Sequence, residues 1–217
     1  MQPWFVLVPA KVLTRAKTRL TPLTAPFGDE APARHRDLVL AMLADTVSAA
    51  VASSAVAAVL VVTDDPQVGD LIRSLRARTV ADEPDRGLNA ALAHGARAAR
   101  AAGARAVAAM NSDLPALHPE DLTHALHTAA ERGRSFVADA EGTGTTLLCA
   151  PSGELDPHFG PGSAAAHAAS GAAPLPGAWP GLRRDVDTAA DLQAAGAIGL
   201  GRHTADYLAT TPWPGSA

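Results

Sequence analysis

The chain has 217 residues, a formal net charge of −4 at pH 7, 47% hydrophobic residues and only 4% aromatic residues. This length suits one α/β domain with its own core, and the scarcity of aromatic residues argues against an all-β sandwich. The acidic balance excludes the positive field that nucleic acid or an anionic membrane would require, and the single cysteine, Cys149, excludes an internal disulfide.

The sequence contains no segment typical of a secretory leader or of a membrane span. The first apolar run, Trp4–Val8, is too short and has no basic residue before it. The Ala-rich stretch over residues 47–62 divides into a helix end and a strand more readily than it forms one span. A lone cysteine also suits a reducing compartment, so we expect a cytoplasmic protein.

Apolar runs alternate with helical periodicities through the first half of the chain. Leu40, Leu43 and Val47 recur at the spacing of one buried helical face. In chain order, the patterns predict a strand at Trp4–Val8, an irregular segment over residues 10–28, a helix at Arg34–Ser53, a strand at Val56–Val62, a helix at Gln67–Arg76, a short strand at Arg78–Ala81, a helix at Leu88–Ala101 and a strand at Ala106–Met110.

The second half continues this alternation, with interruptions rich in Pro and Gly. The elements predicted here are a helix at Pro119–Arg132, strands at Ser135–Asp139 and Thr146–Ala150, a short helix from Ser163 through Ser170, a last strand at Leu182–Val186 and a helix from Ala189 to about Ala195. The passage over residues 171–181 crosses back and suggests that one strand runs against the others. The pattern predicts α/β architecture: a single doubly wound domain over residues 1–210, with a mostly parallel, mixed sheet, helices on both faces and a flexible tail over residues 211–217.

The segment after the first strand reverses the charge of the protein locally. Residues 10–28 contain no Asp or Glu, and their basic residues are Lys11, Arg15, Lys17 and Arg19. A solvated surface loop would explain this composition, but a basic loop directly after the first strand also suits polyphosphate binding. The segment is neither a Walker P-loop nor a dinucleotide fingerprint, because it has no glycine before Gly28.

Two acidic residues fall at the predicted ends of strands, where ligands bind in open α/β sheets. Asp113 follows the strand Ala106–Met110, and Asp185 lies near the end of Leu182–Val186. Asp113 would also serve to cap a turn, and Asp187 competes with Asp185 because strand alternation turns both the same way. We favour Asp185, which lies deeper in the predicted strand.

Carboxylates from two strand ends that face a basic loop suit Mg²⁺ bound to a nucleoside triphosphate, and so predict a nucleotidyltransferase.

Several different short motifs are distributed over about residues 4–192. They are Pro9-Ala10-Lys11, Ala16-Lys17-Thr18-Arg19-Leu20, Gly87-Leu88-Asn89-Ala90-Ala91-Leu92, Ser112-Asp113-Leu114-Pro115, Gly142-Thr143-Gly144-Thr145-Thr146, Phe159-Gly160-x-x-Ser163-x-x-x-His167 and Asp185-Val186-Asp187-Thr188-x-x-Asp191-Leu192. In kind and order this set resembles the guanylyltransferases of deazaflavin coenzyme (coenzyme F-420) biosynthesis. The resemblance implies a nucleotide-diphospho-sugar-transferase-like fold and an enzyme that acts on phosphoenolpyruvate or 2-phospho-L-lactate.

The resemblance also implies a role for each matched residue. Asp113 and Asp185 would hold the metal, and the pocket for the three-carbon phospho-acid would consist of Thr145, Gly160 and Ser163. The opening of a helix at Ser163 suits an anion, because the N-terminal N–H groups of a helix are free. The side chains that would line the triphosphate of GTP are Lys11, Arg15, Lys17 and Arg19.

Of these basic residues, Lys11, Lys17 and Arg19 would be catalytic, because they would stabilise the leaving pyrophosphate. Asn89 would contact the guanine or the ribose. His167 fits helix packing as well as ligand contact. No protein nucleophile is required, since the acceptor phosphate is already anionic.

The implied reaction transfers GMP from GTP to the phosphate of the phospho-acid, with Mg²⁺ as cofactor and release of pyrophosphate. The Ala- and Arg-rich composition is typical of a GC-rich bacterial source. For bacterial members of the family, the resemblance favours phosphoenolpyruvate as the acceptor. The alternatives are a molybdenum-cofactor-type nucleotidyltransferase, which would carry a glycine-rich loop after the first strand, and a nucleotide-binding regulatory module without turnover. GTP and the phospho-acid are the expected partners; handover of the product to a downstream transferase and a homo-oligomer are both compatible with the sequence.

Overall fold

Seven strands, most of them short runs of Val, Ala and Leu, form one mixed sheet in this computed structural model, which describes residues 3–10, 18–83 and 86–211. The strands are β1 Trp4–Pro9, β2 Val56–Val62, β3 Arg78–Val80, β4 Ala106–Met110, β5 Ser135–Ala138, β6 Thr145–Ala150 and β7 Ala173–Pro174. Their order is β3-β2-β1-β4-β6-β5-β7. In the described ranges only β6 runs against its neighbours, β4 and β5. The expected mixed sheet is confirmed, although its reversed strand precedes the crossing passage over residues 171–181.

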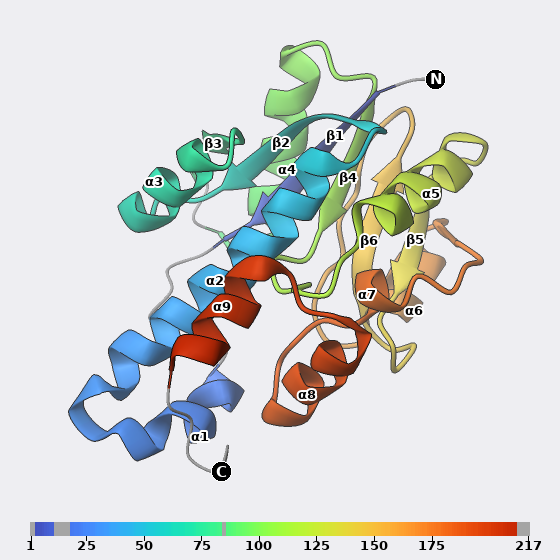
Figure 1. Ribbon diagram of the computed structural model, residues 1–217. Coiled ribbons are helices and arrows are strands. Elements are labelled where there is room, and N and C mark those ends of the chain that lie inside the picture. The colour runs from blue at the N-terminus through green and yellow to red at the C-terminus, as the bar shows by residue number, and fades with distance from the viewer. Residues whose placement is uncertain (1–2, 11–17, 84–85, 212–217) are drawn as a thin grey trace.

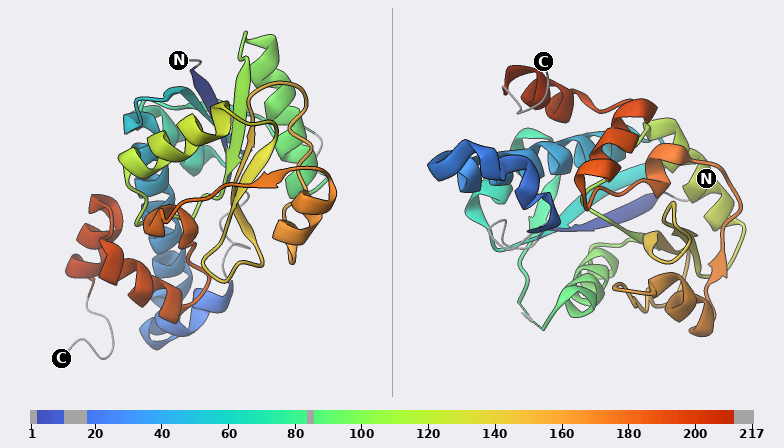
Figure 2. Two further views of the ribbon diagram at one scale, coloured as in Figure 1. Left: turned by 90° about the vertical axis from the view of Figure 1, so that its right-hand side faces the viewer. Right: turned by 90° about the horizontal axis from the view of Figure 1, so that it is seen from below.

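Helices cover both faces of the sheet (Figures 1 and 2). The α-helices are α1 Thr21–Thr24, α2 Ala31–Ala52, α3 Pro66–Ser74, α4 Leu88–Ala101, α5 Pro119–Ala130, α6 Ser163–Ala169, α7 Pro180–Arg183, α8 Ala189–Ile198 and α9 Arg202–Thr210, and the 3₁₀ helices are η2 Thr18–Leu20 and η3 Ala25–Glu30. Helices α2, α3, α5 and α7 pack on one face, and α4 and α6 pack on the other. The doubly wound α/β prediction is therefore confirmed. Within the described residues, no helix is both long and apolar enough to cross a membrane.

Strand β1 shows how the two layers of the core are divided. Successive side chains of a strand point to opposite faces: Val6 and Val8 pack with the α2 layer, whereas Leu7 packs with α4. Gly95 lets α4 approach closely, because a Cβ at this position would lie 2.9 Å from Cγ2 of Val62 and 3.4 Å from Cδ2 of Leu7. A buried glycine inside a helix thus serves helix–sheet packing, as its place on the apolar face of the helix predicts.

The carboxyl ends of the parallel strands meet at one edge of the sheet, together with the start of the reversed strand β6. The N–H of Ala10, after β1, donates to the carbonyl of Val62 at the end of β2, at 3.0 Å. The N–H of Asn111, after β4, donates to the carbonyl of Thr146 at 2.9 Å. Ala10 at the end of β1, the loop that follows β4 and the turn between β5 and β6 are therefore neighbours, and this edge positions the site.

The predicted last strand at Leu182–Val186 is wrong. The segment forms the short helix α7, and residues 184–188 follow it without regular structure. Pro180 occupies the first turn of α7, where its missing N–H costs nothing. Leu182 and Val186 are both fully buried, but they enter different clusters, one beneath the α2 layer and one beneath α8. Two apolar residues four positions apart were thus mistaken for one face of a strand.

Two further differences concern residues 18–28 and the last described helix. Residues 18–28, predicted as irregular, belong to the short helices η2, α1 and η3, and both α1 and η3 have a proline in the first turn. Helix α9, which packs along α2 (Figure 1), had no predicted counterpart. Of the predicted tail over residues 211–217, only Thr211 lies within the described residues, and its N–H donates to the carbonyl of Tyr207 at 3.1 Å.

A carboxylate from a distant helix caps the N-terminus of α9. Asp45 on α2 is almost fully buried and accepts the backbone N–H groups of His203 and Thr204, each at 2.8 Å. Gly201 permits this approach, because a Cβ there would lie 2.7 Å from the Cβ of Asp45. The pairing connects two helices that are far apart in sequence, and it satisfies two N–H groups that no residue within α9 reaches.

Asp45→Ala is expected to lower the free energy of unfolding by about 2–3 kcal/mol, because two N–H groups at a helix start lose their acceptor. Asp45→Asn retains one acceptor oxygen and should cost less. Urea unfolding followed by circular dichroism measures both variants against the wild type. If Asp45→Ala were as stable as the wild type, the cap would have no energetic role.

Candidate active site

A cleft of about 710 Å³ opens at the edge where the strand ends meet. Its walls come from the end of β1, from η2, α2 and the start of α4, from the loops after β4 and β5, from the segment before α6 and from the segment that follows α7. Its charged and polar lining residues include Arg19, Asp113, Asp139, Thr145, Ser163, Asp185 and Asp187. The structure therefore brings Asp113, Asp185 and the three predicted phospho-acid residues to one cavity, from elements that are up to 72 residues apart.

Hydrogen bonds of the backbone at Asp113 and Leu114 hold Asp113 in place. It is 6% exposed. The N–H of Leu114 donates to the hydroxyl of Thr46 on α2 at 2.9 Å, and the carbonyl of Asp113 accepts the N–H of Val186 at 3.1 Å. The last bond joins the loop after β4 to the segment that carries Asp185, so the two predicted metal ligands lie on directly bonded backbone segments.

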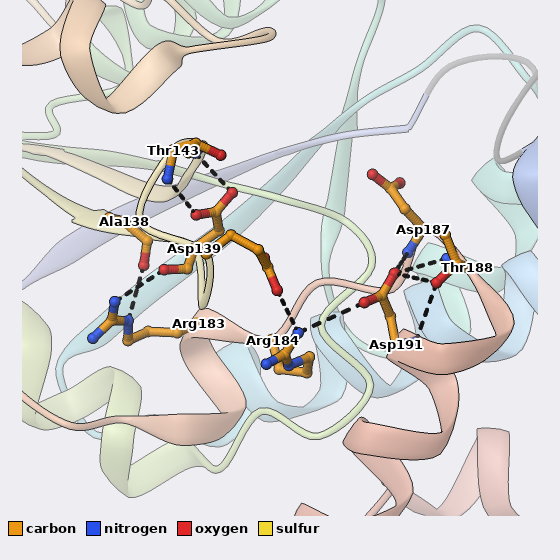
Figure 3. A network of polar contacts seen from close by, with 10 residues as sticks. Ala138, Asp139, Thr143, Arg183, Arg184, Asp187, Thr188 and Asp191 are labelled. Carbon is orange, nitrogen blue, oxygen red and sulfur yellow. Dashed lines mark hydrogen bonds and ion pairs between the residues drawn. The ribbon is translucent and has the colours of Figure 1, made fainter.

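Two arginines fasten the Asp185 segment to the turn between β5 and β6 (Figure 3). Arg183 donates from Nε to the carbonyl of Ala138 at 3.1 Å and from Nη2 to the carbonyl of Asp139 at 3.0 Å. Arg184 forms an ion pair with Glu141 at 2.8 Å and lies 3.6 Å from Asp191 on α8. The position of Asp185 thus depends on the guanidinium groups that precede it in sequence, and not on a strand.

An acidic cluster surrounds Asp185. Asp139, Glu141 and Asp185 each offer a carboxylate oxygen, and these atoms lie within 4.8 Å of one another. Asp139 and Glu141 were not predicted from the sequence, although Asp139 follows a strand just as Asp113 does. Asp139 accepts the N–H groups of Thr143 and Gly144 at 2.9 and 2.7 Å. Asp139 has its partners within the turn, Glu141 pairs with Arg184, and Asp185 is the member of this cluster that the sequence also predicted as a metal ligand.

Asp187 also lines the cleft, but its backbone is engaged in the start of α8. Its N–H donates to Oδ2 of Asp191 at 3.3 Å, beside the capping box that Thr188 and Asp191 form (Figure 3). The side chain of Asp185 instead faces Asn111, just after β4: Nδ2 of Asn111 lies 3.5 Å from Oδ2 of Asp185. The strand alternation that was used to compare the two aspartates does not apply, since residues 184–188 are not a strand.

The three residues predicted to hold the phospho-acid meet at one wall of the cleft. Thr145 is the first residue of β6, Ser163 is the first residue of α6, and both are buried. The N–H of Ser163 donates to the carbonyl of Gly160 at 3.1 Å, and Gly160 has φ +136°, which side chains other than glycine rarely adopt. A tight turn that requires glycine at position 160 therefore shapes the pocket, next to the hydroxyl groups of Thr145 and Ser163.

Asn89, in the first turn of α4 on the same face of the sheet, holds this turn. Its Nδ2 donates to the carbonyl of Phe159 at 3.0 Å, and its Oδ1 accepts the N–H of Phe159 at 2.7 Å. The cleft lining includes its neighbour Leu88. Contact between Asn89 and the nucleotide stays a prediction. What the structure gives is a side-chain amide that fixes the backbone next to Gly160.

The basic part of the predicted site is described only in part. Arg19, in η2, lines the cleft and is exposed. Lys11, Arg15 and Lys17 lie outside the described residues, so their contact with a triphosphate stays a prediction.

Comparison with known proteins identifies the family of this chain. The family model described as guanylyl transferase CofC like matches residues 4–172. A phosphoenolpyruvate guanylyltransferase of Geodermatophilus obscurus is 59% identical over 209 residues, which cover 96% of this chain and 95% of that protein. A protein of the same name from Thermomonospora curvata is 51% identical over 212 residues, which cover 96% and 90%.

Solved structures bear on the fold alone. A nucleotidyl transferase from Methanothermobacter thermautotroptrophicus matches with a TM-score of 0.57 at 18% identity, over 96% of this chain and 99% of that one. This likeness confirms the fold expected from the sequence motifs. Because the family model covers most of the chain and the relatives align over nearly all of it, the chain belongs to the CofC-like guanylyl transferase family.

Proposed function

We propose that this protein transfers GMP from GTP to the phosphate of phosphoenolpyruvate and releases pyrophosphate. The observation that carries the proposal is the joint placement of Asp113, Asp185, Thr145 and Ser163 in one cleft of a chain that is 59% identical to a phosphoenolpyruvate guanylyltransferase. The acceptor follows the names of the relatives, and 2-phospho-L-lactate is the competing acceptor. The product would serve coenzyme F-420 biosynthesis in the cytoplasm.

The donor atoms of the cleft fit a magnesium ion. Mg²⁺ prefers hard oxygen ligands and takes one or two carboxylates together with phosphate oxygens. Asp113 and Asp185 supply carboxylates on adjoining backbone segments of the cleft, and we propose them as its ligands. When bound, Mg²⁺ would neutralise phosphate charge and align the reacting groups.

The residues of the chain then have distinct tasks. Thr145, Gly160 and Ser163 would hold the phospho-acid by its anionic groups, so that one of its phosphate oxygens faces the α-phosphorus of GTP. A new bond forms between that oxygen and the α-phosphorus, while the bond from the α-phosphorus to the oxygen that bridges to the β-phosphorus breaks. The electron pair leaves with pyrophosphate, whose charge Arg19, with Lys11 and Lys17, would stabilise. No general base is needed, because the attacking phosphate is already deprotonated at neutral pH.

The test is a pyrophosphate-release assay with purified protein, Mg²⁺ and GTP. We expect release that depends on phosphoenolpyruvate, slower release with 2-phospho-L-lactate, and little release when CTP or ATP replaces GTP. Mass spectrometry of the product should show the mass of a guanylylated phosphoenolpyruvate. Absence of pyrophosphate with either phospho-acid would contradict the enzyme assignment, and faster turnover of 2-phospho-L-lactate would reverse the order of acceptors.

A further inference from the structure

His167 is an unusual residue for the interior of this protein. It lies on α6 and is fully buried, with Phe159 edge-on to its ring at a centroid distance of 5.1 Å and Phe136 at 5.9 Å. Burial, with a smaller effect from nearby His158, lowers the pKa of His167 to about 4. The imidazole is therefore neutral at neutral pH and carries a single N–H.

The hydrogen bonds of this ring decide which nitrogen carries the hydrogen. The backbone N–H of His158 points at Nε2 of His167 at 2.9 Å. A backbone N–H can only donate, so Nε2 must be the unprotonated nitrogen, which accepts. The hydrogen of the neutral ring then lies on Nδ1, and Nδ1 lies 2.9 Å from Oγ1 of Thr145. This contact is a bond in which His167 donates and the Thr145 hydroxyl accepts.

The direction of that bond determines what Thr145 offers to the cleft. A hydroxyl that accepts through one lone pair still has its own hydrogen to donate. Among the described residues, no acceptor for the Thr145 hydroxyl hydrogen is found, and Thr145 lines the cleft. Had His167 been an acceptor, the hydrogen would point at the ring and lone pairs would face the cleft, which would repel a carboxylate or a phosphate.

We propose that His167 is a positioning residue that turns the Thr145 hydroxyl into an obligatory donor for the anionic phospho-acid. The ring does not line the cleft, so its effect would pass through the hydroxyl of Thr145. The same ring, by accepting the N–H of His158, fixes the backbone just before Phe159 and Gly160, so one side chain sets both the wall and the polarity of the pocket. That the anion is a phospho-acid rests on the proposed function.

A matched pair of variants separates the two bonds of the ring. The amide nitrogen of Asn lies near the place of Nδ1, and the end of a Gln side chain lies near the place of Nε2. His167→Asn therefore keeps a donor for Thr145, and His167→Gln keeps an acceptor for the N–H of His158. We expect His167→Gln to raise the KM for phosphoenolpyruvate about tenfold, the size of one lost hydrogen bond to a charged group, with an unchanged KM for GTP. His167→Asn, which leaves the N–H of His158 without its acceptor but keeps the donor for Thr145, should raise this KM less than His167→Gln does.

A double-mutant cycle tests whether His167 acts through Thr145. Thr145→Val should also raise the KM for phosphoenolpyruvate about tenfold, and Thr145→Val with His167→Gln should add little to either single change. A merely structural His167 would instead give multiplied effects, about a hundredfold, and a parallel rise in the KM for GTP. That result, or a larger effect of His167→Asn than of His167→Gln, would overturn the proposal.

A direct readout of the tautomer keeps this inference separate from the proposed function. In ¹⁵N-labelled wild-type protein at neutral pH, two-dimensional ¹H–¹⁵N spectra of the histidine rings should show the proton of His167 on Nδ1 and a bare Nε2. A proton on Nε2 would refute the proposal even in an active enzyme. Wild-type protein that turns over no phospho-acid, yet shows Nδ1 protonated, would refute the proposed function and leave Thr145 as a donor to another anion.

Discussion

Asp185→Asn is expected to lower kcat with GTP and phosphoenolpyruvate by about 10²–10³-fold at saturating Mg²⁺. The amide has the shape of the carboxylate but not its charge, so it removes a ligand for a hard cation, and charge stabilisation in the transition state with it. Asp113→Asn should have an effect of the same order. A pyrophosphate assay over a range of Mg²⁺ concentrations measures both, and higher Mg²⁺ should restore part of the activity. Circular dichroism should show both variants folded.

Two matched changes locate the metal among the neighbouring carboxylates. Asp187→Asn should retain most of the activity, because the backbone at Asp187 belongs to the start of α8. Glu141→Gln should also retain most of it, since Glu141 is an exposed residue that pairs with Arg184. Full activity in Asp185→Asn with loss in Asp187→Asn would show that the other aspartate is the ligand. Loss in Glu141→Gln equal to that in Asp185→Asn would instead place the ion in the cluster of Asp139, Glu141 and Asp185.

The elements that the sequence predicted best are those whose pattern is local. Strands β2 and β4 and helix α4 have the predicted bounds, Val56–Val62, Ala106–Met110 and Leu88–Ala101. Each is a continuous apolar run or a clean helical periodicity bounded by glycine, proline or polar residues, so neighbouring residues alone decide the conformation. The place of Asp113 at the cleft was predictable for the same reason: it follows a strand whose direction and burial are evident from the run before it, while its role as a metal ligand stays a prediction.

What the sequence did not reveal depends on partners far along the chain. Helix α9 has a polar first turn, and the acceptor for its N–H groups is Asp45, which lies more than 150 residues earlier. The approach of Asp139 and Glu141 to Asp185 depends on the two arginines that bind the turn between β5 and β6. Single-sequence patterns carry no information on such pairings, because any arginine would satisfy the local pattern equally well.

Asp185 was therefore singled out partly by a wrong argument. Its place at the end of a strand was the physical reason, and the structure has no strand there. The resemblance to a family, which rests on residue identity rather than on secondary structure, led to the same residue. The helix that replaces the strand, α7, is what carries Asp185 to the cleft, and its packing can be tested independently of the metal.

Gly181→Ala is expected to lower the free energy of unfolding by about 3 kcal/mol, at the upper end of the range for overpacked cores. A Cβ at this position would lie 2.7 Å from the carbonyl carbon of Ala116, closer still to its oxygen, and 3.2 Å from Cα of Leu117. The obstacle is backbone, which cannot rotate away as a side chain does. Because the φ of Gly181 is not in the left-handed region, the cost comes from space alone and not from conformation.

Gly196→Ala is the matched control. Gly196 lies inside α8, and a Cβ there would meet nothing within 4 Å. Alanine should raise the stability by about 0.5–1 kcal/mol, because it loses less backbone entropy in a helix than glycine does. Thermal and urea unfolding of the two variants therefore should shift in opposite directions. Equal shifts would mean that the stability changes report the loss of glycine in general and not the packing of α7.

The activity of Gly181→Ala distinguishes displacement of α7 from simple destabilisation. Arg183 and Arg184 come just after Gly181 and Leu182 and bind the turn between β5 and β6, so a displaced α7 would carry Asp185 away from Asp113. At a temperature where the variant is still folded, kcat should fall with an increased requirement for Mg²⁺, as in Asp185→Asn. A folded variant with normal kcat and normal Mg²⁺ dependence would show that Asp185 reaches the cleft without the close packing of α7 on Ala116.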